Sequence, residues 1–335
     1  MPLKTPDFWY RSKGSSPSVI EYFMAPISLL YQYGHRINLR TTQSNSVDIP
    51  VICIGNVTVG GSGKTPVSIA INRIIKERNL FDAPFFLTRG YGGTEPGPRR
   101  IEVHEDAKTV GDEPLLLASH SNTIVSVNRY RGSQLVQELG GDCIIMDDGL
   151  QNQSLSKSVS FIVINGKMGL GNEKTIPAGP LREPIDTAIL RCDAIIMIGQ
   201  DERDIKDKIP EHIPMFRAEI KPSQGVKPGK GQNYIAFSGI AYPQKFFDTL
   251  EKSGYNVIES KSFSDHHAFT DHEIETLKTL ANDRSAQLIT TEKDYVRLPQ
   301  NVQQDIKTLP VTLVWDNEEE IYQFLSDKLK EFKEP

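Results

Sequence analysis

The chain has 335 residues, enough for one large or two ordinary domains that each bury a core. Its formal net charge is −5, so no overall positive field favours a nucleic-acid partner. The three cysteines form no CxxC pair, and no run of 18 apolar residues or signal-peptide core occurs. We therefore expect a cytoplasmic chain with free thiols at Cys53, Cys143 and Cys192.

The first 45 residues contain a predicted amphipathic helix. Ser15, Ser16 and Pro17 resemble an N-cap followed by proline in the first turn, and a kink is expected at Pro26. Such a helix fits a bilayer interface with its cations near lipid phosphates, and equally fits packing onto the protein body. Its apolar face comprises Ile20, Phe23, Met24, Ile27, Leu30 and Tyr31, and its basic flanks comprise Lys4, Arg11, Lys13, Arg36 and Arg40.

A strand-like run at 51–55 leads into a glycine-rich loop and then a helical period. Backbone N–H groups of such a loop, with the positive end of the helix dipole, cradle phosphate. Lys64 is placed to reach the β- and γ-phosphates and Thr65 the Mg²⁺, so the chain handles a nucleoside triphosphate. Thr58 replaces the usual first glycine, which indicates a variant loop. The predicted nucleotide-binding residues are Thr58, Val59, Gly60, Gly61, Ser62, Gly63, Lys64 and Thr65.

Two pairs of carboxylates follow. Asp112 and Glu113 precede an apolar helix, where they either cap it or orient an attacking hydroxyl or a metal. Asp147 and Asp148 end an apolar strand, as in phosphate-loop enzymes that place an Asp against Mg²⁺. Asp147 is the predicted metal-side residue, and a strand-end pair that only caps a turn is the alternative.

Basic side chains follow several strands. Arg89 and Tyr91 share a glycine-containing loop, Arg129 follows another strand, and Arg182 lies between prolines. Loops at the carboxyl ends of parallel strands bind ligands, so these arginines are candidates to bind substrate phosphate or stabilise charge during transfer. Each also fits an ordinary surface salt bridge.

From Pro50 onward, Val/Ile-rich runs alternate with helical periods, which predicts an α/β fold with a mostly parallel, P-loop NTPase-like sheet covered by helices on both faces. A Pro/Gly/Lys-rich stretch then precedes a smaller α/β alternation. The predicted parts are an N-terminal segment 1–45, a kinase domain 46–220, a linker 221–233 and a smaller domain 234–335. Expected strands are 51–55, 84–88, 123–127, 142–146, 160–164 and 193–198, with helices near 65–78, 112–119 and 131–139.

Three histidines and two aspartates cluster at 265–272 in the smaller domain. Their spacing fixes no Zn²⁺ ligand set. The alternative is one histidine, polarised by a carboxylate, that transfers a proton near neutral pH.

Eight motifs, in chain order from about residue 20 to 300, resemble the tetraacyldisaccharide 4'-kinase family of Gram-negative lipid A biosynthesis. Thr58 in place of glycine is part of that family's pattern. The motifs are Gly55–Pro66, Thr88–Gly92, Gly111–Pro114, Asp147–Gln151, Pro177–Pro184, Phe237–Ala241, Asp265–His267 and Thr290–Asp294.

The resemblance implies that ATP phosphorylates the 4'-hydroxyl of tetraacyldisaccharide 1-phosphate, forming lipid IVA, with Mg²⁺ as the metal. It also implies peripheral docking of the N-terminal helix on the cytoplasmic face of the inner membrane, without a nucleic-acid or protein partner. The implied roles are Asp112 as base, with His266 and Lys64 also catalytic; Thr65, Asp147, Asp148 and Glu113 toward the metal; Tyr91 and Arg182 toward the nucleotide; and Arg89 and Arg129 toward the lipid.

Two residues depart from the family pattern. Asn152 stands where a histidine is common and Asn165 where an aspartate is common, so roles of those side chains in relatives are not carried over. A nucleotide-driven switch or metallochaperone-like NTPase shares the phosphate loop, but Thr291–Asp294 does not satisfy the N-K-x-D pattern of GTP-specific members. A soluble kinase of small metabolites is the other alternative. Under that hypothesis the amphipathic N-terminal segment has no role except ordinary packing against the core.

Overall fold

Runs of Val, Ile, Phe and Met form the strands of a large sheet, because β-branched and aromatic side chains suit a pleated surface buried on both faces. The computed structural model describes residues 6–11, 16 and 18–332. The strands of this sheet are Val51–Gly55 (β1), Pro84–Thr88 (β2), Arg99–Ile101 (β3), Thr123–Val125 (β4), Cys143–Asp147 (β5), Val159–Asn165 (β6), Ala194–Ile198 (β7), Met215–Pro222 (β8) and Val311–Trp315 (β13).

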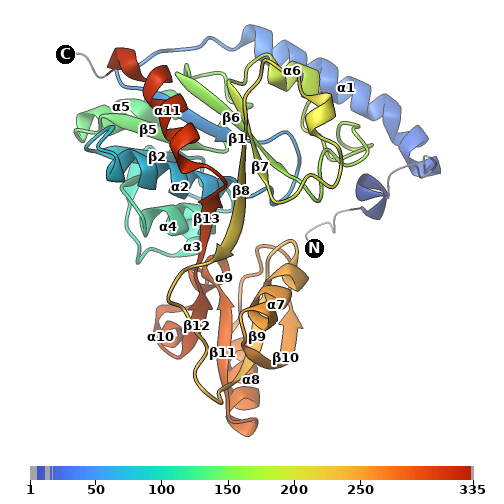
Figure 1. Ribbon diagram of the computed structural model, residues 1–335, viewed down its shortest axis with the longest axis vertical. Helices are drawn as coiled ribbons and strands as arrows, with labels where there is room; N and C mark the ends of the chain where they lie inside the picture. The colour runs from blue at the N-terminus through green and yellow to red at the C-terminus, as the bar shows by residue number, and fades with distance from the viewer. Residues whose placement is uncertain (1–5, 12–15, 17, 333–335) are drawn as a thin grey trace.

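Within the described residues, these nine strands lie in the order β13-β8-β7-β6-β1-β5-β2-β4-β3. Figure 1 shows the large sheet with its helices, and the smaller sheet beyond the far ends of β8 and β13. Neighbouring strands are parallel except at the two edges, where β13 and β3 run antiparallel to their neighbours. The expected mostly parallel sheet is confirmed. Because β1 lies next to β5, the loop after β1 and the carboxylates after β5 meet at one edge of the sheet.

Helices cover both faces of the large sheet. Ile71 and Leu325 pack in one core with Ile145, whereas Val136 packs against Phe85 on the opposite face. This layering explains why the central strands are apolar throughout. The helices of this part are Val19–Thr41 (α1), Lys64–Glu77 (α2), Ala107–Val110 (α3), Asp112–Ala118 (α4), Arg129–Glu138 (α5), Ile185–Ile189 (α6) and Glu318–Lys328 (α11), with 3-10 turns at Asp7–Tyr10, Lys206–Lys208 and Lys330–Phe332.

A smaller parallel sheet forms the second α/β part, as the sequence predicted. Its strands are Asn233–Ser238 (β9), Asn256–Ser262 (β10), Ala286–Thr291 (β11) and Ile306–Leu309 (β12), in the order β10-β9-β11-β12. Its helices are Pro243–Lys252 (α7), Asp271–Asp283 (α8), Glu292–Tyr295 (α9) and Gln300–Gln303 (α10). Leu277 of α8 packs in one core of this sheet and Leu250 of α7 in the other, so both faces are covered.

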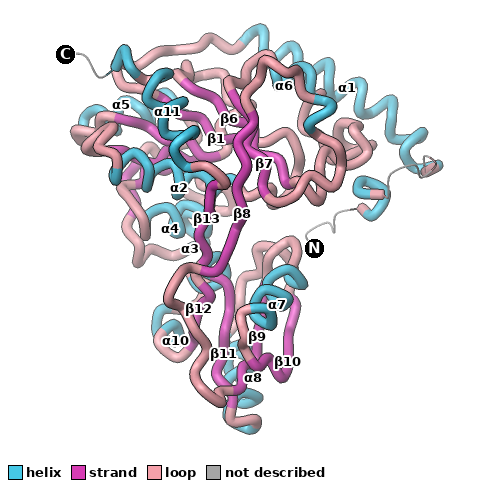
Figure 2. Tube along the Cα trace, in the orientation of Figure 1, coloured by secondary structure: helices cyan, strands magenta, loops and turns pink. Residues whose placement is uncertain are grey.

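The antiparallel pair β8 and β13 links the two sheets (Figure 2). The chain leaves the large sheet after β8, builds the smaller sheet and returns through β13. Residues 311–332 therefore lie with the large sheet, not in the smaller domain of 234–335 that the sequence analysis proposed. Apolar burial explains the return, because Trp315, Ile321 and Leu329 complete the core around α2.

The N-terminal helix α1 packs on the large domain by its polar side. Ser28 donates to the carbonyl of Thr175 at 2.9 Å, and Glu21 is fully buried. The apolar residues point outward: Phe23 is 75% and Leu30 72% exposed. Helix α1 therefore does pack on the protein body, as one of the two alternatives had it, but through its polar side, which leaves most of the apolar face uncovered.

The start of α1 also differs from the expectation. Ser18 is the N-cap, and its side chain forms a capping box with Glu21. The expected cap residue Ser15 and the proline at 17 lie outside the described residues, and so do the basic flanking residues Lys4 and Lys13. The helix continues through Pro26.

Candidate active site

The phosphate loop joins β1 to α2. Gly60 has φ 106° and Gly63, the residue before α2, has φ 93°, conformations that side-chain-bearing residues rarely adopt. The Asn56 amide braces the loop from inside by donating to the Thr58 carbonyl at 2.8 Å and to Ser62 Oγ at 2.9 Å. Residues 59–61 are exposed, so their backbone is open to a ligand. The loop is shaped for an anion at a helix N-terminus.

A second loop supports the phosphate loop and explains the absent glycine at 58. Thr58 pairs with Leu181 as an isolated antiparallel bridge. Val59 N–H donates to the Pro180 carbonyl at 2.8 Å, and Arg182 N–H donates to the Val57 carbonyl at 2.7 Å. An extended, paired residue needs no positive φ, so threonine is accepted there.

Asp147 lies at the end of β5 against the start of α2. It is 1% exposed and accepts hydrogen bonds from Thr65 Oγ1 at 3.1 Å and Ser68 Oγ at 2.9 Å. Burial, with the neighbouring negative charge of Glu113, raises the pKa of Asp147 to about 7. Ionisation of Asp147 is therefore costly unless a cation lies beside it. Because Asp147 also bonds the hydroxyl of Thr65, the residue after the loop lysine, a metal ion bound at this place would supply that cation.

This raised pKa predicts a pH-dependent stability. The unfolded carboxyl titrates at about 4, so between pH 4 and 7 the folded metal-free protein binds more protons, and stability falls as pH rises. Asp147→Asn should therefore be more stable than wild type at pH 8, by on the order of a few kcal/mol, and differ less at pH 5. Denaturant unfolding in EDTA at both pH values measures this. Added Mg²⁺ should stabilise wild type more than the variant, and an equal response would contradict a metal role for Asp147.

Asp148 faces two cations. Its Oδ1 lies 2.8 Å from Arg182 Nη1 and 3.7 Å from Lys64 Nζ. Burial alone would raise the pKa of Asp148, but Lys64 and Arg182 outweigh it and lower the pKa. The structure thus brings the predicted loop lysine, the second strand-end carboxylate and the predicted nucleotide-side arginine together.

Asp112 meets His266 across the two domains. Gly111 precedes Asp112 with φ 92°, where a Cβ atom would lie 2.5 Å from the Tyr91 carbonyl, so only glycine fits there. The Asp112 carboxylate is 5% exposed, and its Oδ2 lies 3.0 Å from His266 Nδ1. Tyr91 packs edge-on to His266, with ring centroids 5.7 Å apart. The two proposed proton-handling groups are in direct contact.

Two basic residues of α9 and its C-terminal flank also reach this carboxylate, and the sequence analysis did not single them out. Arg297 donates to Asp112 Oδ2 through Nε at 2.8 Å and through Nη2. Lys293 Nζ lies 3.0 Å from Glu113 Oε1 and 3.9 Å from Asp112 Oδ2. Lys293 lies within the motif Thr290–Asp294, which in the sequence indicates only likeness to the family and a departure from the GTP-specific pattern.

Neighbouring charges in this cluster keep the Asp112 carboxylate and the Lys293 ammonium ionised. Burial would raise the pKa of Asp112, but His266, Lys293 and Arg297 together lower it well below its usual range. Burial would lower the pKa of Lys293, but Glu113 and Asp112 raise it. Glu113, a predicted metal-side group, is thus paired with a cation from the smaller domain.

The arginines predicted to face the acceptor differ in burial. Arg89 is exposed, whereas Arg129 at the start of α5 is 2% exposed, and its Nε has no hydrogen-bond partner among the described residues. Burial lowers the pKa of Arg129 to about 10, partly opposed by Asp148. A buried guanidinium with an unpaired donor is costly unless an anion completes it. Tyr91, predicted near the nucleotide, is 66% exposed.

The two residues that depart from the family pattern serve local turns. Asn152 Oδ1 accepts from Ser154 N–H at 3.1 Å, and Asn165 Oδ1 accepts from Lys167 N–H at 3.1 Å.

In the histidine cluster at 265–272, His267 pairs with Glu273 at 3.0 Å. Across the described ranges, no group of three His, Cys, Asp or Glu side chains is arranged to hold a metal ion, so the structure gives no support for a zinc site in this cluster.

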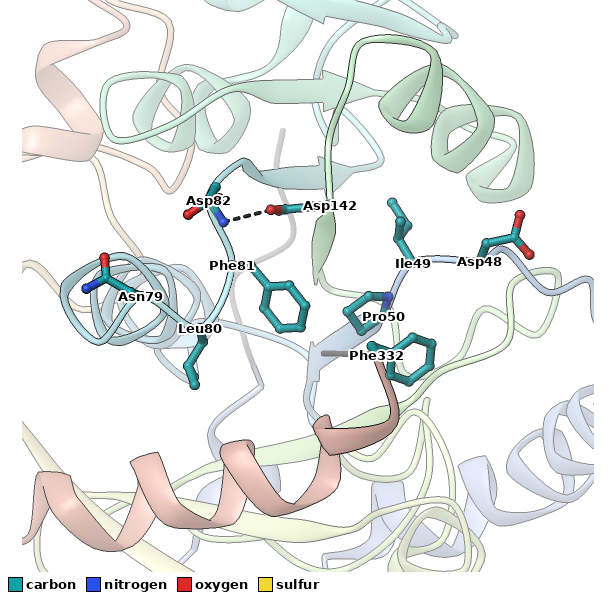
Figure 3. A pocket seen from close by; sticks show the side chains of 9 residues that line it. All are labelled: Asp48, Ile49, Pro50, Asn79, Leu80, Phe81, Asp82, Asp142 and Phe332. Carbon is teal, nitrogen blue, oxygen red and sulfur yellow. Dashed lines mark hydrogen bonds between the residues drawn. The ribbon is translucent and has the colours of Figure 1, made fainter. Parts of the chain in front are cut away.

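One surface hollow of the described residues lies away from this site. It is bordered by Asp82, Asp142 and Phe332 near the amino ends of β1 and β5 (Figure 3). Asp142 Oδ2 accepts from Asp82 N–H at 2.7 Å, so it closes a turn there. The phosphate loop is at the opposite, carboxyl end of β1, where parallel sheets bind ligands.

Comparison with known proteins places this geometry in a family. A family model described as Tetraacyldisaccharide-1-P 4'-kinase matches residues 20–330. A tetraacyldisaccharide 4'-kinase of Paramagnetospirillum magneticum is 42% identical over 316 residues, covering 94% of this chain and 95% of that protein. One of Rhodospirillum centenum is 36% identical over 329 residues, covering 98% and 97%.

A solved structure has the same fold. LpxK from Aquifex aeolicus, described as an "apo" form in complex with ATP, is 26% identical with a TM-score of 0.75, covering 92% of this chain and 99% of that one. The resemblance inferred from the motifs is confirmed over nearly the whole chain. This chain belongs to the tetraacyldisaccharide 4'-kinase family.

Proposed function

We propose that the γ-phosphate of ATP passes to the 4'-hydroxyl of tetraacyldisaccharide 1-phosphate, forming lipid IVA, beside the contact between the two domains. The observation that carries this proposal is the 3.0 Å contact between Asp112 of the large domain and His266 of the smaller one. It provides a group that accepts the proton of an attacking alcohol, next to a phosphate loop on the same sheet edge.

The residues present fit ATP and Mg²⁺. Residues 58–65 would hold the triphosphate, and Thr65, Asp147 and Asp148 would hold the metal. Asp147 supports this because its carboxylate is buried with hydroxyl partners, and no described Lys, Arg or His forms an ion pair with it. When bound, Mg²⁺ would neutralise charge on the phosphates. Arg182, held by Asp148, is available on the nucleotide side, and Tyr91, which packs against His266, is the second proposed nucleotide-side residue.

Phosphoryl transfer depends mainly on positioning and charge, and the chain's own groups supply both. Lys64 offers its ammonium to the transferred phosphate. Asp112, kept ionised by its basic neighbours, accepts the proton of the 4'-hydroxyl with assistance from His266. Because His266 comes from the smaller domain, domain contact completes the site and limits access of water to the phosphate.

Two arginines are proposed to meet the acceptor's anionic group. Arg129 is buried, and its Nε has no hydrogen-bond partner among the described residues. Arg89 is exposed, and its positive charge adds to the lowering of the Arg129 pKa, so the two guanidinium groups lie near each other. A 1-phosphate offers the acceptor oxygens that such donors lack.

The exposed face of α1 is proposed to dock on the cytoplasmic surface of the inner membrane. Among the described residues, no helix is long and apolar enough to cross a bilayer. A helix on the surface of a soluble protein normally buries its apolar side chains and exposes its polar ones. Helix α1 does the opposite, because it buries Glu21 and Ser28 and exposes Phe23 and Leu30. An interfacial helix needs that arrangement, with apolar side chains in lipid.

This docking predicts a loss of lipid binding on changing two side chains. Phe23→Gln with Leu30→Gln should weaken partitioning to vesicles containing anionic lipid by roughly tenfold or more, since each buried side chain contributes about 1.5–3 kcal/mol. Vesicle co-sedimentation measures it. Leu139→Gln, at a 45% exposed position at the end of α5, is the matched control and should partition like wild type. Equal partitioning of all three proteins would exclude docking through α1.

The enzymatic proposal is tested directly. Purified protein, Mg-ATP and the disaccharide lipid in mixed micelles should yield a bis-phosphorylated lipid. ATP hydrolysis that is independent of the lipid, with no phosphorylated lipid, would favour the switch-like NTPase. Transfer to a water-soluble alcohol in preference to the lipid would favour a small-metabolite kinase.

A further inference from the structure

Arg297 joins the two domains through a single guanidinium. The side chain is 5% exposed. Its Nε and Nη2 donate to Asp112 Oδ2 of the large domain, and its Nη1 donates to Asp294 Oδ1 at 3.0 Å and to the Gly239 carbonyl at 2.9 Å. One planar group therefore bonds two carboxylates that belong to different domains, Asp112 in α4 and Asp294 in α9.

The far side of this guanidinium is anchored in the smaller domain. Asp294 is fully buried and accepts from Ser238 Oγ at 2.9 Å, Gly239 N–H at 3.0 Å and Thr291 Oγ1 at 2.7 Å. These donors come from the end of β9 and the start of α9. The bonds from Ser238 and Gly239 are buried and the one from Thr291 is partly buried, so water competes little with them and the Asp294 carboxylate is held in place.

The same network supports His266. The His266 N–H donates to the Gly239 carbonyl at 3.0 Å, the oxygen that also accepts from Arg297. His266 has φ 55°, a conformation that costs energy for a residue with a side chain and persists only when its surroundings enforce it. Gly239 therefore ties the histidine backbone to the arginine that holds Asp112.

We infer that Arg297 is a positioning residue for phosphoryl transfer, which fixes the Asp112 carboxylate and His266 in register across the domain contact. This inference rests on the proposed role of Asp112 as the proton acceptor. Asp112 Oδ2 receives both His266 and Arg297, while its Oδ1 accepts the Glu113 N–H at 3.0 Å. With both oxygens oriented, the carboxylate has one placement relative to an incoming hydroxyl.

Arginine suits this position because its donors diverge. A lysine ammonium is a single point charge and cannot bond Asp112 on one side and Asp294 with Gly239 on the other in a fixed plane. Loss of the guanidinium would leave two buried carboxylates without their shared cation. Replacement of Arg297 should therefore disturb the placement of Asp112 and His266 and should also lower the stability of the fold.

The test uses the full chain with Mg-ATP and lipid in micelles. Arg297→Ala should lower kcat about 10²-fold, as expected for misplacement of a reacting group, with the KM for ATP within about twofold of wild type. Millimolar guanidinium should restore part of the lost kcat, which a purely structural defect would not allow. Arg78→Gln, which removes an exposed ion pair with Glu319, is the control and should behave like wild type.

Measuring the effect of Arg297→Ala in the Asp112→Asn variant distinguishes a failure of this inference from a failure of the proposed function. In Asp112→Asn, the further change Arg297→Ala should cost less than about threefold, because the two residues act as a unit. A loss of 10² in that background, or a raised KM with unchanged kcat and no guanidinium rescue, would overturn the positioning role. Full activity of Asp112→Asn alone would instead reject the proposed role of Asp112.

Folding is controlled with a conservative variant. Arg297→Lys keeps the charge and should melt near wild type while losing at least tenfold in kcat. If Arg297→Ala does not fold, this variant decides: native-like melting with wild-type kcat would overturn the inference.

Discussion

Lys64→Ala is expected to lower kcat/KM for ATP roughly 10²- to 10³-fold, the usual effect of losing one donor aimed at developing charge. Lys64 is the first residue of α2, directly after Gly63, and its Nζ lies 3.7 Å from Asp148 Oδ1. Its removal takes away the cation nearest the predicted phosphates. Alanine is a good helix former, so α2 should remain intact.

Steady-state kinetics and calorimetric binding of a nonhydrolysable ATP analogue would measure this effect. Lys76→Ala provides the matched control, since Lys76 lies near the other end of the same helix and donates only to Ser121 at the surface among its described contacts. The control should retain wild-type transfer. Wild-type nucleotide affinity and transfer in Lys64→Ala would remove the basis for the phosphate-loop assignment.

The parts of this site that are formed by neighbouring residues in the sequence could be predicted. A strand, a glycine-rich turn and a helix start are contiguous, so the order of Gly63, Lys64 and Thr65 contained the geometry. The pairing of Asp147 with Thr65 also followed, because strand-end carboxylates in parallel sheets meet at one edge. Asp148 and Arg182 were each named, and the structure brings them within 2.8 Å.

Contacts between distant segments were not predictable. Nothing local to β13 tells whether it pairs with the large or the smaller sheet, and only the burial of Trp315 and Leu329 decides. Arg297 lies three residues after the motif Thr290–Asp294. Its importance comes from its bond to Asp112, which lies 185 residues earlier in the chain and could not be foreseen from the local sequence. Periodicity likewise identified the apolar face of α1 without showing which side packs.

The polar packing of α1 has a physical explanation. Gln32 Nε2 donates to Thr175 Oγ1 at 2.9 Å, and His35 Nε2 lies 3.3 Å from Glu183 Oε2, so the helix is held by directed bonds. Burial would raise the pKa of Glu183, but His35 and Arg191 lower it, which keeps a buried anion under the helix. Directed bonds free the apolar face for another role, and such faces mark interaction sites.

Asp112→Asn is expected to lower kcat by roughly 10²- to 10⁴-fold, the range for a lost general base, with nucleotide affinity unchanged. Asparagine is nearly isosteric and its carbonyl oxygen can still accept from Arg297, so the site should keep its shape while losing the group that accepts the proton. Micelle kinetics with analogue binding separates these two effects.

The control for this substitution is Asp106→Asn. Asp106 caps α3, its Oδ1 accepts from Lys108 N–H at 2.9 Å, and asparagine caps helices equally well. The same chemical change six residues earlier should therefore leave both kcat and melting temperature at wild-type values. Retained transfer in Asp112→Asn would mean that the proton leaves by another route, and His266, whose Nδ1 is 3.0 Å from this carboxylate, would then be the group to replace.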